Sequence, residues 1–228
     1  MSTLSLLRGI QFIDSFFPSG GYAFSSGLEA AVQGGAVRNA EDLTHYVSDY
    51  LRGGLGSREA VVVGLAQDAA SRGTLSIALD ADLALDAMQL CRETRMASRQ
   101  MGRQVIRIAC DRDDVSAILR DFLAEVESGR SPGHLAVSLG LTLGTVGWNK
   151  QEAVAAFLYQ NAAGLVSAAL KLLPIGHREG QRLLESWLPL IEKLSHEVES
   201  RTEMASWMPV QDIFAMRHSR LESRLFRS

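Results

Sequence analysis

AVAAFLYQNAAGLVSAALKLL, residues 153–173, is the stretch that decides the fold. Wound as a helix, its apolar residues cover nearly the whole circumference, and Lys171 is its single charged residue. A helix that is apolar on nearly all sides belongs in the middle of a protein. Pro174 and Gly176 follow directly and stop a helix. We therefore expect a central buried helix with other helices packed around it.

The flanking sequence also repeats its apolar residues at helical spacing. This spacing predicts helices over residues 43–51, 83–91, 115–126 and 181–194. Asn39 and Asp113 are placed to cap the first and third of these, and Gly129 with Pro132 ends the third. We expect Pro189 to kink or divide the last helix.

Alternation typical of a strand occurs only in QVIRIA, residues 104–109. This segment could be a strand, but a single strand cannot make a sheet. We predict an all-α fold in which residues 1–228 form one domain of roughly eight to ten helices, given mean helix lengths of about 11–12 residues. Residues 209–228 are expected to be a C-terminal partner-binding segment of that domain.

Composition narrows the class of protein. Of the 228 residues, 46% are apolar and 21% charged, and the net charge of −3 does not favour binding to nucleic acid. Cys91 and Cys110 provide no disulfide framework, which suits a reducing compartment. The first fifteen residues lack a basic start and a long apolar core, so we expect a cytoplasmic protein that does not bind membranes.

No residue pattern marks a catalytic, metal or cofactor site. Residues 14–29, DSFFPSGGYAFSSGLE, lack the lysine of a phosphate-binding loop, and Ser19 precedes the glycines instead of lying between them. We interpret this stretch as a tight turn, after which Ser25 or Ser26 caps a helix that begins near Gly27. The five histidines show no i, i+4 pair, so we expect no metal ligand set.

Two stretches carry rows of arginine at helical spacing. The first row has a solvated helix face as its simplest interpretation, with an acidic partner as the alternative: Arg92, Arg95, Arg99 and Arg103. The second lies in PVQDIFAMRHSRLESRLFRS, residues 209–228, and comprises Arg217, Arg220, Arg224 and Arg227. In a helix these four lie beside an apolar stripe made of Phe214, His218, Leu221 and Leu225.

The stripe of this C-terminal segment could dock on the protein's own core or on a partner. Each buried apolar side chain would contribute about 1.5–3 kcal/mol to holding the helix down. The arginines add little to folding, because exposed ion pairs contribute about 0.2–1 kcal/mol each. In an interface a single arginine can contribute about 2 kcal/mol or more. We therefore favour a partner, and the helix could form only when that partner is bound.

Several segments together resemble the urease accessory protein F (UreF) family. They keep the family's order and extend over nearly the whole chain: DSFFPSGGYAFSSGLE at 14–29, SRQMGR at 98–103, GHLAVSLGL at 133–141, LKLLPIGHREGQ at 170–181 and DIFAMRHSRLESRLFRS at 212–228. The resemblance implies an all-α, non-catalytic scaffold without a cofactor. It would bridge a D/H-type accessory protein and the nickel-carrying G-type accessory GTPase, and dimerise in their complex. That complex docks on apo-urease and supports GTP-dependent nickel delivery.

The resemblance also implies roles for individual residues. Lys171 matches a lysine that engages the GTPase. The residues that match the surface for the D/H-type partner and dimer assembly are Asp212, Met216, His218, Arg224, Leu225, Phe226 and Ser228. Phe214, Leu221, Arg217, Arg220 and Arg227 are assigned to the partner-binding segment by spacing alone. Ser219 and His177 depart from the family pattern, where Glu and Gln are usual. An enzyme and a nucleic-acid-binding regulator are the competing hypotheses.

Overall fold

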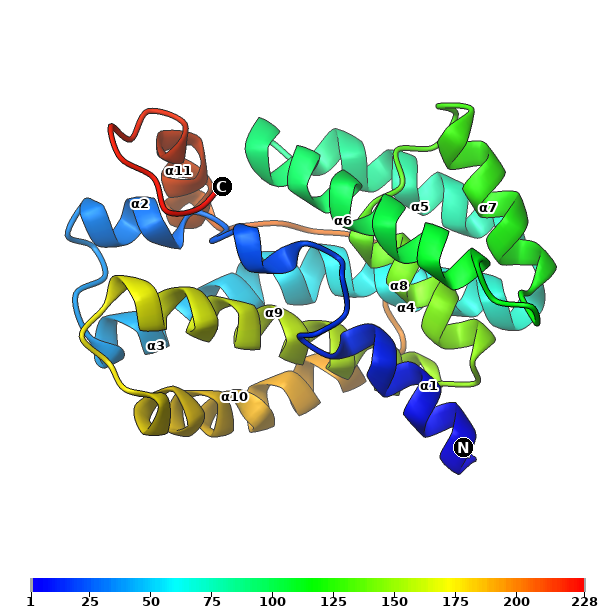
Figure 1. The fold of residues 1–228 in the computed structure, drawn as a ribbon, viewed down its shortest axis with the longest axis horizontal. Coiled ribbons are helices and arrows are strands. Elements are labelled where there is room, and N and C mark those ends of the chain that lie inside the picture. Colours follow the sequence, from blue (N-terminus) through cyan, green and yellow to red (C-terminus); the bar gives the residue numbers. More distant parts are fainter. Residues whose placement is uncertain (1, 228) are drawn as a thin grey trace.

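The computed structural model describes residues 2–227, and within them every regular element is a helix (Figure 1). The all-α prediction is confirmed. The elements are α1 (Thr3–Ile13), the 3₁₀-helix η1 (Gly21–Ala23), α2 (Leu28–Gln33), α3 (Ala40–Tyr50), the π-helix η2 (Leu51–Glu59), α4 (Ala60–Arg72), α5 (Leu75–Met88), α6 (Arg92–Cys110), α7 (Ala117–Glu127), α8 (Leu135–Thr145), α9 (Lys150–Leu172), α10 (His177–Val198) and α11 (Pro209–His218).

The helix expected at the centre is α9. It starts at a capping box in which the Asn149 side chain accepts the Glu152 N–H and Glu152 accepts the Asn149 N–H. It packs against α4, α8 and α10, and Val154, Phe157 and Leu158 are buried. Among the described residues α9 alone is long and apolar enough to cross a membrane, but 56% of its most apolar window is buried in the fold. That burial is typical of the core helix of a globular protein.

Small residues set the spacing of the helices around α9. Helix α8 packs closely on α4, and a Cβ atom on Gly140 would lie 2.5 Å from the Val63 carbonyl oxygen. Gly102 of α6 lies against the start of α8 in the same way, because its Cβ would be 2.3 Å from the Gly133 oxygen. At both places two backbones approach more closely than any side chain permits.

Glycines also seat the segment that leads into α11. η2 continues α3 into α4, and Gly53 and Gly54 lie in it. A Cβ on Gly53 would lie 2.3 Å from the Trp207 oxygen, and one on Gly54 would lie 2.2 Å from the Met208 sulfur. The Trp207 N–H donates to the Gly53 oxygen at 2.7 Å. The long crossing from α10 to α11, visible in Figure 1, is therefore fixed against η2 at its end.

Some of the helix caps and helix stops predicted for α3 and α7 are confirmed, and one is wrong. Asn39 caps α3 by accepting the Asp42 N–H at 2.9 Å, as expected. Helix α7 ends before Gly129, which has a φ of 77°, also as expected. Asp113 as its cap is wrong, because the helix starts at Ala117 with Ser116 as N-cap residue.

Three other expectations need correction. Residues 104–109 lie inside α6 and are not a strand; Val105, Ile106 and Ala109 are buried at helical spacing. The helix expected over 83–91 is interrupted, because α5 ends at Met88 and α6 begins at Arg92. Of the two outcomes expected at Pro189, a kink or a division, the division is wrong, because α10 runs through this residue.

The close approach of α4 and α8 gives a testable prediction. Gly140→Ala should destabilise the protein by about 1–3 kcal/mol, because the added methyl group forces the two backbones apart. Gly164→Ala is the matched control: Gly164 lies mid-helix in α9 with nothing within 4 Å of its Cβ position. It should stabilise by about 0.5–1 kcal/mol through better helix propensity. Urea unfolding measures both, and equal effects would contradict the packing described.

Candidate functional site

The turn predicted over residues 14–29 brings the C-terminal segment, residues 209–227, into contact with the body of the protein. α2 begins at Leu28 with Gly27 as its N-cap residue, so the expected serine cap is wrong, although the Ser25 hydroxyl accepts the Glu29 N–H at 3.4 Å. Gly27 precedes it with a φ of 85°. A Cβ on Gly27 would lie 2.8 Å from the Ala215 nitrogen, so α11 packs directly on this turn.

The carboxylate of Glu29 is the centre of this contact. The side chain is fully buried, at 0% exposure. One oxygen accepts from His218 Nε2 at 2.9 Å and from the Phe226 N–H at 3.1 Å. The other accepts from the Leu225 N–H at 2.7 Å and from Gln33 Nε2 at 3.4 Å. The C-terminal segment thus wraps around one buried negative charge.

His218 connects two carboxylates. Its Nε2 faces Glu29, and its Nδ1 lies 3.0 Å from Glu93 Oε2 on α6. Ionised carboxylates only accept hydrogen bonds, so both ring nitrogens are placed to donate. Burial is the largest influence on the Glu29 pKa and raises it, but the hydrogen bonds from Leu225, His218 and Phe226 outweigh it and lower the pKa below 4.5.

Two aromatic rings anchor the segment to the core. Phe214 and Phe226 are 9% and 6% exposed and belong to the hydrophobic core. Lys171, at the end of α9, places its Nζ 5.2 Å from the centroid of the Phe226 ring, a cation–π contact. The residue that the resemblance assigns to the GTPase therefore lies beside the segment that it assigns to the D/H-type partner.

The expected single helix through Leu225 and Arg227 is wrong. α11 ends at His218, and the Leu225 and Phe226 N–H groups donate to Glu29 instead of to helix carbonyls. The apolar stripe divides accordingly: Phe214 and His218 are buried, Leu221 is half-buried and Leu225 is 71% exposed.

The remaining predicted residues mostly face solvent. Met216 is 44% exposed, and the four arginines are exposed although they share no helix face: Arg217, Arg220, Arg224 and Arg227. Arg224 lies 3.5 Å from Glu93, whereas the other three form no ion pair with another described residue. Asp212 is half-buried near the Arg58–Glu59 ion pair, and burial raises its pKa. Ser228 lies outside the described residues.

Sequence reasoning missed Glu29 and Glu93 as partners of His218. In the sequence, Glu29 is an ordinary acidic residue of a first helical turn, and it lies 189 positions from His218. A contact over that distance leaves no spacing signal. The one available hint was that Glu29 and His218 both belong to segments that carry the family resemblance.

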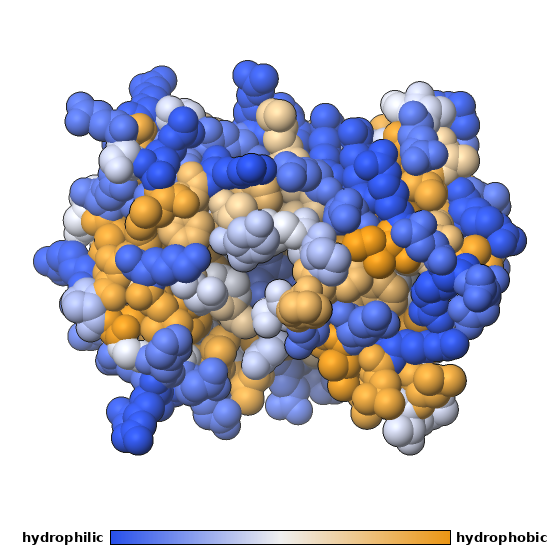
Figure 2. Space-filling view, in the orientation of Figure 1, coloured by the Kyte–Doolittle hydropathy of each residue, from blue (hydrophilic) through white to orange (hydrophobic). Residues whose placement is uncertain are grey.

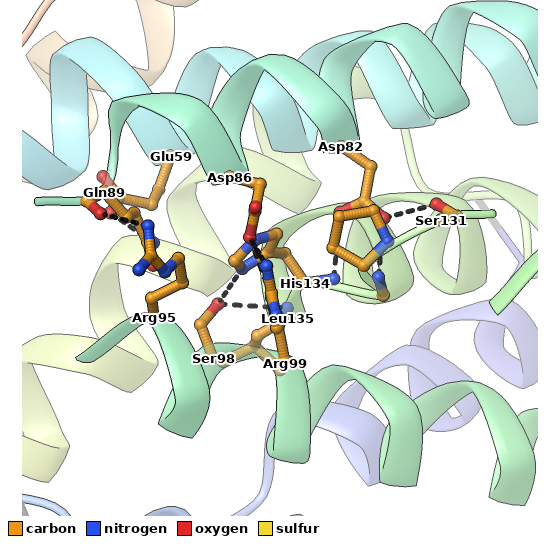
Figure 3. A network of polar contacts seen from close by, with 12 residues as sticks. Glu59, Asp82, Asp86, Gln89, Arg95, Ser98, Arg99, Ser131, His134 and Leu135 are labelled. Carbon is orange, nitrogen blue, oxygen red and sulfur yellow. Dashed lines mark hydrogen bonds and ion pairs between the residues drawn. The ribbon is translucent and has the colours of Figure 1, made fainter. Parts of the chain in front are cut away.

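A second polar cluster joins α5, α6 and the start of α8 (Figure 3). Asp82 is fully buried and accepts from the Gly133 N–H at 2.6 Å, the His134 N–H at 2.9 Å and the Ser131 hydroxyl at 2.5 Å. A carboxylate is favourable at these N–H groups because they begin α8. Arg99 pairs with the neighbouring Asp86.

His134 in this cluster superficially resembles the histidine of a catalytic triad. Its Nδ1 lies 3.0 Å from the Ser98 hydroxyl and its Nε2 lies 2.9 Å from Asp86. Burial is the main cause that lowers its pKa, so a neutral ring donates to Asp86 and accepts from Ser98. The Ser98 oxygen in turn accepts the Leu135 N–H at 3.3 Å, and His134 is 0% exposed. These contacts join helices and give no access to a substrate.

The same cluster accounts for most of the first arginine row. Arg95 donates to the Gln89 oxygen and Arg103 to the Pro132 oxygen, while Arg99 pairs with Asp86. Of the four, only Arg92 is exposed, and the other three are half-buried. Within residues 2–227 no group of three or more His, Cys, Asp or Glu side chains is arranged to hold a metal ion.

The fold and the site define a class: an all-α protein whose buried polar clusters join helices and pin a C-terminal segment. The chain belongs to the UreF family, whose model matches residues 37–187. It is 31% identical over 225 residues to the urease accessory protein UreF of Bacillus sp. strain TB-90, covering 98% of this chain and 99% of the relative. It is 32% identical over 230 residues to that of Methylorubrum populi, covering 99% of this chain and 100% of the relative.

The Glu29 cluster predicts a pH-dependent stability. Because folding lowers the Glu29 pKa, its stabilising contribution is present above about pH 4.5 and lost as the pH falls through the lower, folded value. Glu29→Gln should cost about 1.5–3 kcal/mol at neutral pH, since it removes the charge that accepts hydrogen bonds from His218, Leu225 and Phe226. Urea unfolding between pH 3 and 7 measures both effects.

The exposed Glu222, in the same segment, supplies the control. Glu222→Gln should change stability by less than about 0.5 kcal/mol. If Glu29→Gln behaved like Glu222→Gln, the Glu29 carboxylate would not hold the C-terminal segment.

Proposed function

We propose that this protein is a non-catalytic scaffold in urease maturation. It bridges a D/H-type accessory protein and the nickel-carrying G-type accessory GTPase, and their complex supports GTP-dependent insertion of nickel into apo-urease. Nickel is the cargo in this scheme. Membership of the UreF family and the name urease accessory protein carried by its full-length relatives support the role in maturation.

The geometry that best supports a scaffold is the anchored C-terminal segment. Its inward residues, His218 and Phe226, are tied to the body, while Met216, Arg220 and Leu225 face solvent. A segment held in this way presents its outward groups without the entropy cost of ordering a free tail, which improves binding to a partner. We assign these outward groups to the D/H-type partner and to dimer assembly.

Lys171 is assigned to the GTPase. It is exposed and forms no ion pair with another described residue, so its charge is available to a second protein. Its contact with Phe226 makes the two proposed partner surfaces adjacent. A protein bound to one surface would then affect binding at the other surface, which suits a protein that bridges two partners.

Several further expectations belong to this proposal. The chain acts in the cytoplasm as one domain over residues 1–228, dimerises within the complex, and binds neither nucleic acid nor membranes. An enzyme is the less favoured function, because the triad-like group found among residues 2–227, around His134, is buried and saturated with internal hydrogen bonds.

Leu225→Asp tests the proposed surface. Leu225 is 71% exposed, so the variant should change the melting temperature by no more than about 2–4 °C. It should weaken co-elution with the D/H-type protein by about tenfold or more, since a charge would replace an apolar contact in the interface. Size-exclusion chromatography of the mixed proteins measures this loss.

Leu83→Asp is the matched control, because Leu83 is 51% exposed on α5 and belongs to no proposed surface. It should co-elute as the wild type does. If the wild-type chain itself co-eluted with neither accessory protein at moderate salt, the scaffold proposal would fall.

A further inference from the structure

A cavity of about 470 Å³ lies between the segment before α2 and the face of α9. Figure 2 shows it as a hollow near the middle of this side of the molecule. Its volume is in the range of roughly 300–1,000 Å³ that is typical of ligand pockets. The wall is mainly apolar, with Ile13, Phe17, Phe24, Met101 and Leu165 among its members, and Phe226 closes one end.

Gly164 keeps the cavity open on the α9 side. A Cβ added there would meet nothing within 4 Å. At every other glycine inside an α- or π-helix of residues 2–227, a Cβ would come within 3.0 Å of another atom: Gly9, Gly53, Gly54, Gly56, Gly64, Gly102, Gly140, Gly144 and Gly180. Close packing explains those glycines but not Gly164, which weakens its helix for no internal contact.

Large apolar side chains surround the mouth. Tyr22 is 81% exposed, Tyr159 42% and Ile10 41%, and all three line the cavity. Phe16, 93% exposed, lies between two lining residues in the sequence. Exposed apolar side chains gathered around one hollow are typical of a surface that another molecule covers.

Gln160 gives the lining a polar contact. Its Nε2 donates toward the Phe12 and Ile13 carbonyl oxygens at 3.5 and 3.3 Å, which fixes the orientation of the amide. Its Oε1 has no hydrogen-bond partner within the described residues. This buried acceptor beside the cavity has no donor among the described residues.

Two exposed cations, Lys171 and Arg227, lie near Phe226, whose N–H donates to the buried Glu29 carboxylate. Gly164, Ser167 and Lys171 follow at i, i+3 and i+7 on one face of α9, so Lys171 lies along the line from the cavity to the Phe226 ring. The Arg227 N–H donates to the Ala23 oxygen, which keeps this exposed arginine at the same end. Neither cation forms an ion pair with another described residue.

We propose that this cavity binds an acidic segment of a partner protein, with an aromatic or branched side chain of that segment inserted beside Gly164. Its carboxylates would lie over Lys171 and Arg227. Phe226 already shows that the site accepts an aromatic ring under Lys171. The inference rests on the proposed function for the existence of a protein partner, and it adds the chemistry by which the partner is recognised at the Lys171 end.

Gly164→Leu is the variant that tests the cavity, because it fills the space without straining the fold. Better helix propensity should keep the melting temperature equal to or above that of the wild type. The probe is a fluorescein-labelled heptapeptide with a central tryptophan and three acidic residues on each side. We expect fluorescence anisotropy to show binding to the wild type, and a loss of about tenfold or more in Gly164→Leu and in Lys171→Glu.

Two controls distinguish binding in the cavity from non-specific binding to exposed apolar side chains and from binding by charge alone. Gln181→Leu adds the same side chain to an exposed position of α10 and should bind the peptide as the wild type does. The same peptide with alanine in place of tryptophan should bind at least about tenfold more weakly. Absence of binding to the wild type, equal binding of the two peptides, or unchanged binding by Gly164→Leu would each overturn the proposal.

Co-elution with the accessory proteins distinguishes the two proposals. If the wild type and Gly164→Leu both co-elute with their partners while the peptide does not bind, the cavity assignment fails and the scaffold stands. If the peptide binds in the cavity as expected but neither accessory protein co-elutes with the wild type, the scaffold fails and the cavity stands.

Discussion

The position of the C-terminal segment, residues 209–227, depends on the buried carboxylate of Glu29. A carboxylate at 0% exposure is costly unless it is paired and hydrogen-bonded. Three of its four donors come from residues 218–226, at the far end of the chain. The last residues cannot leave without stranding that charge, so they are part of the fold. The outward residues are therefore displayed from a fixed base.

The same segment is fitted to the body by shape. Gly27, Gly53 and Gly54 each remove a side chain where the approach to Ala215, Trp207 and Met208 is closest. Charge and shape thus act on neighbouring parts of one segment. Together they explain why the residues of this segment divide so sharply: Phe214 and Phe226 lie in the core, while Met216, Leu225 and the arginines are exposed.

Features set by short-range physics could be predicted from the sequence. The all-round apolar run predicted α9, and Asn39 predicted the start of α3. The errors arose where distant contacts decide. Glu29 competes for the N–H groups that would have continued α11, and the burial of Val105 and Ile106 makes a helix of an alternating run. Most arginines of the first row bind internal partners such as Asp86. Residue spacing alone does not predict these contacts.

Hydrogen exchange of the Leu225 and Phe226 amides in the free chain tests the central claim most directly. Both lie outside any helix, and among the described residues their hydrogen-bond acceptor is Glu29. The account predicts that they exchange slowly in the wild type and lose that protection in Glu29→Gln, while the amides of α9 stay protected in both. Exchange at the rate of an unfolded chain in the wild type would contradict it, because the segment would then have no fixed base from which to present its surface.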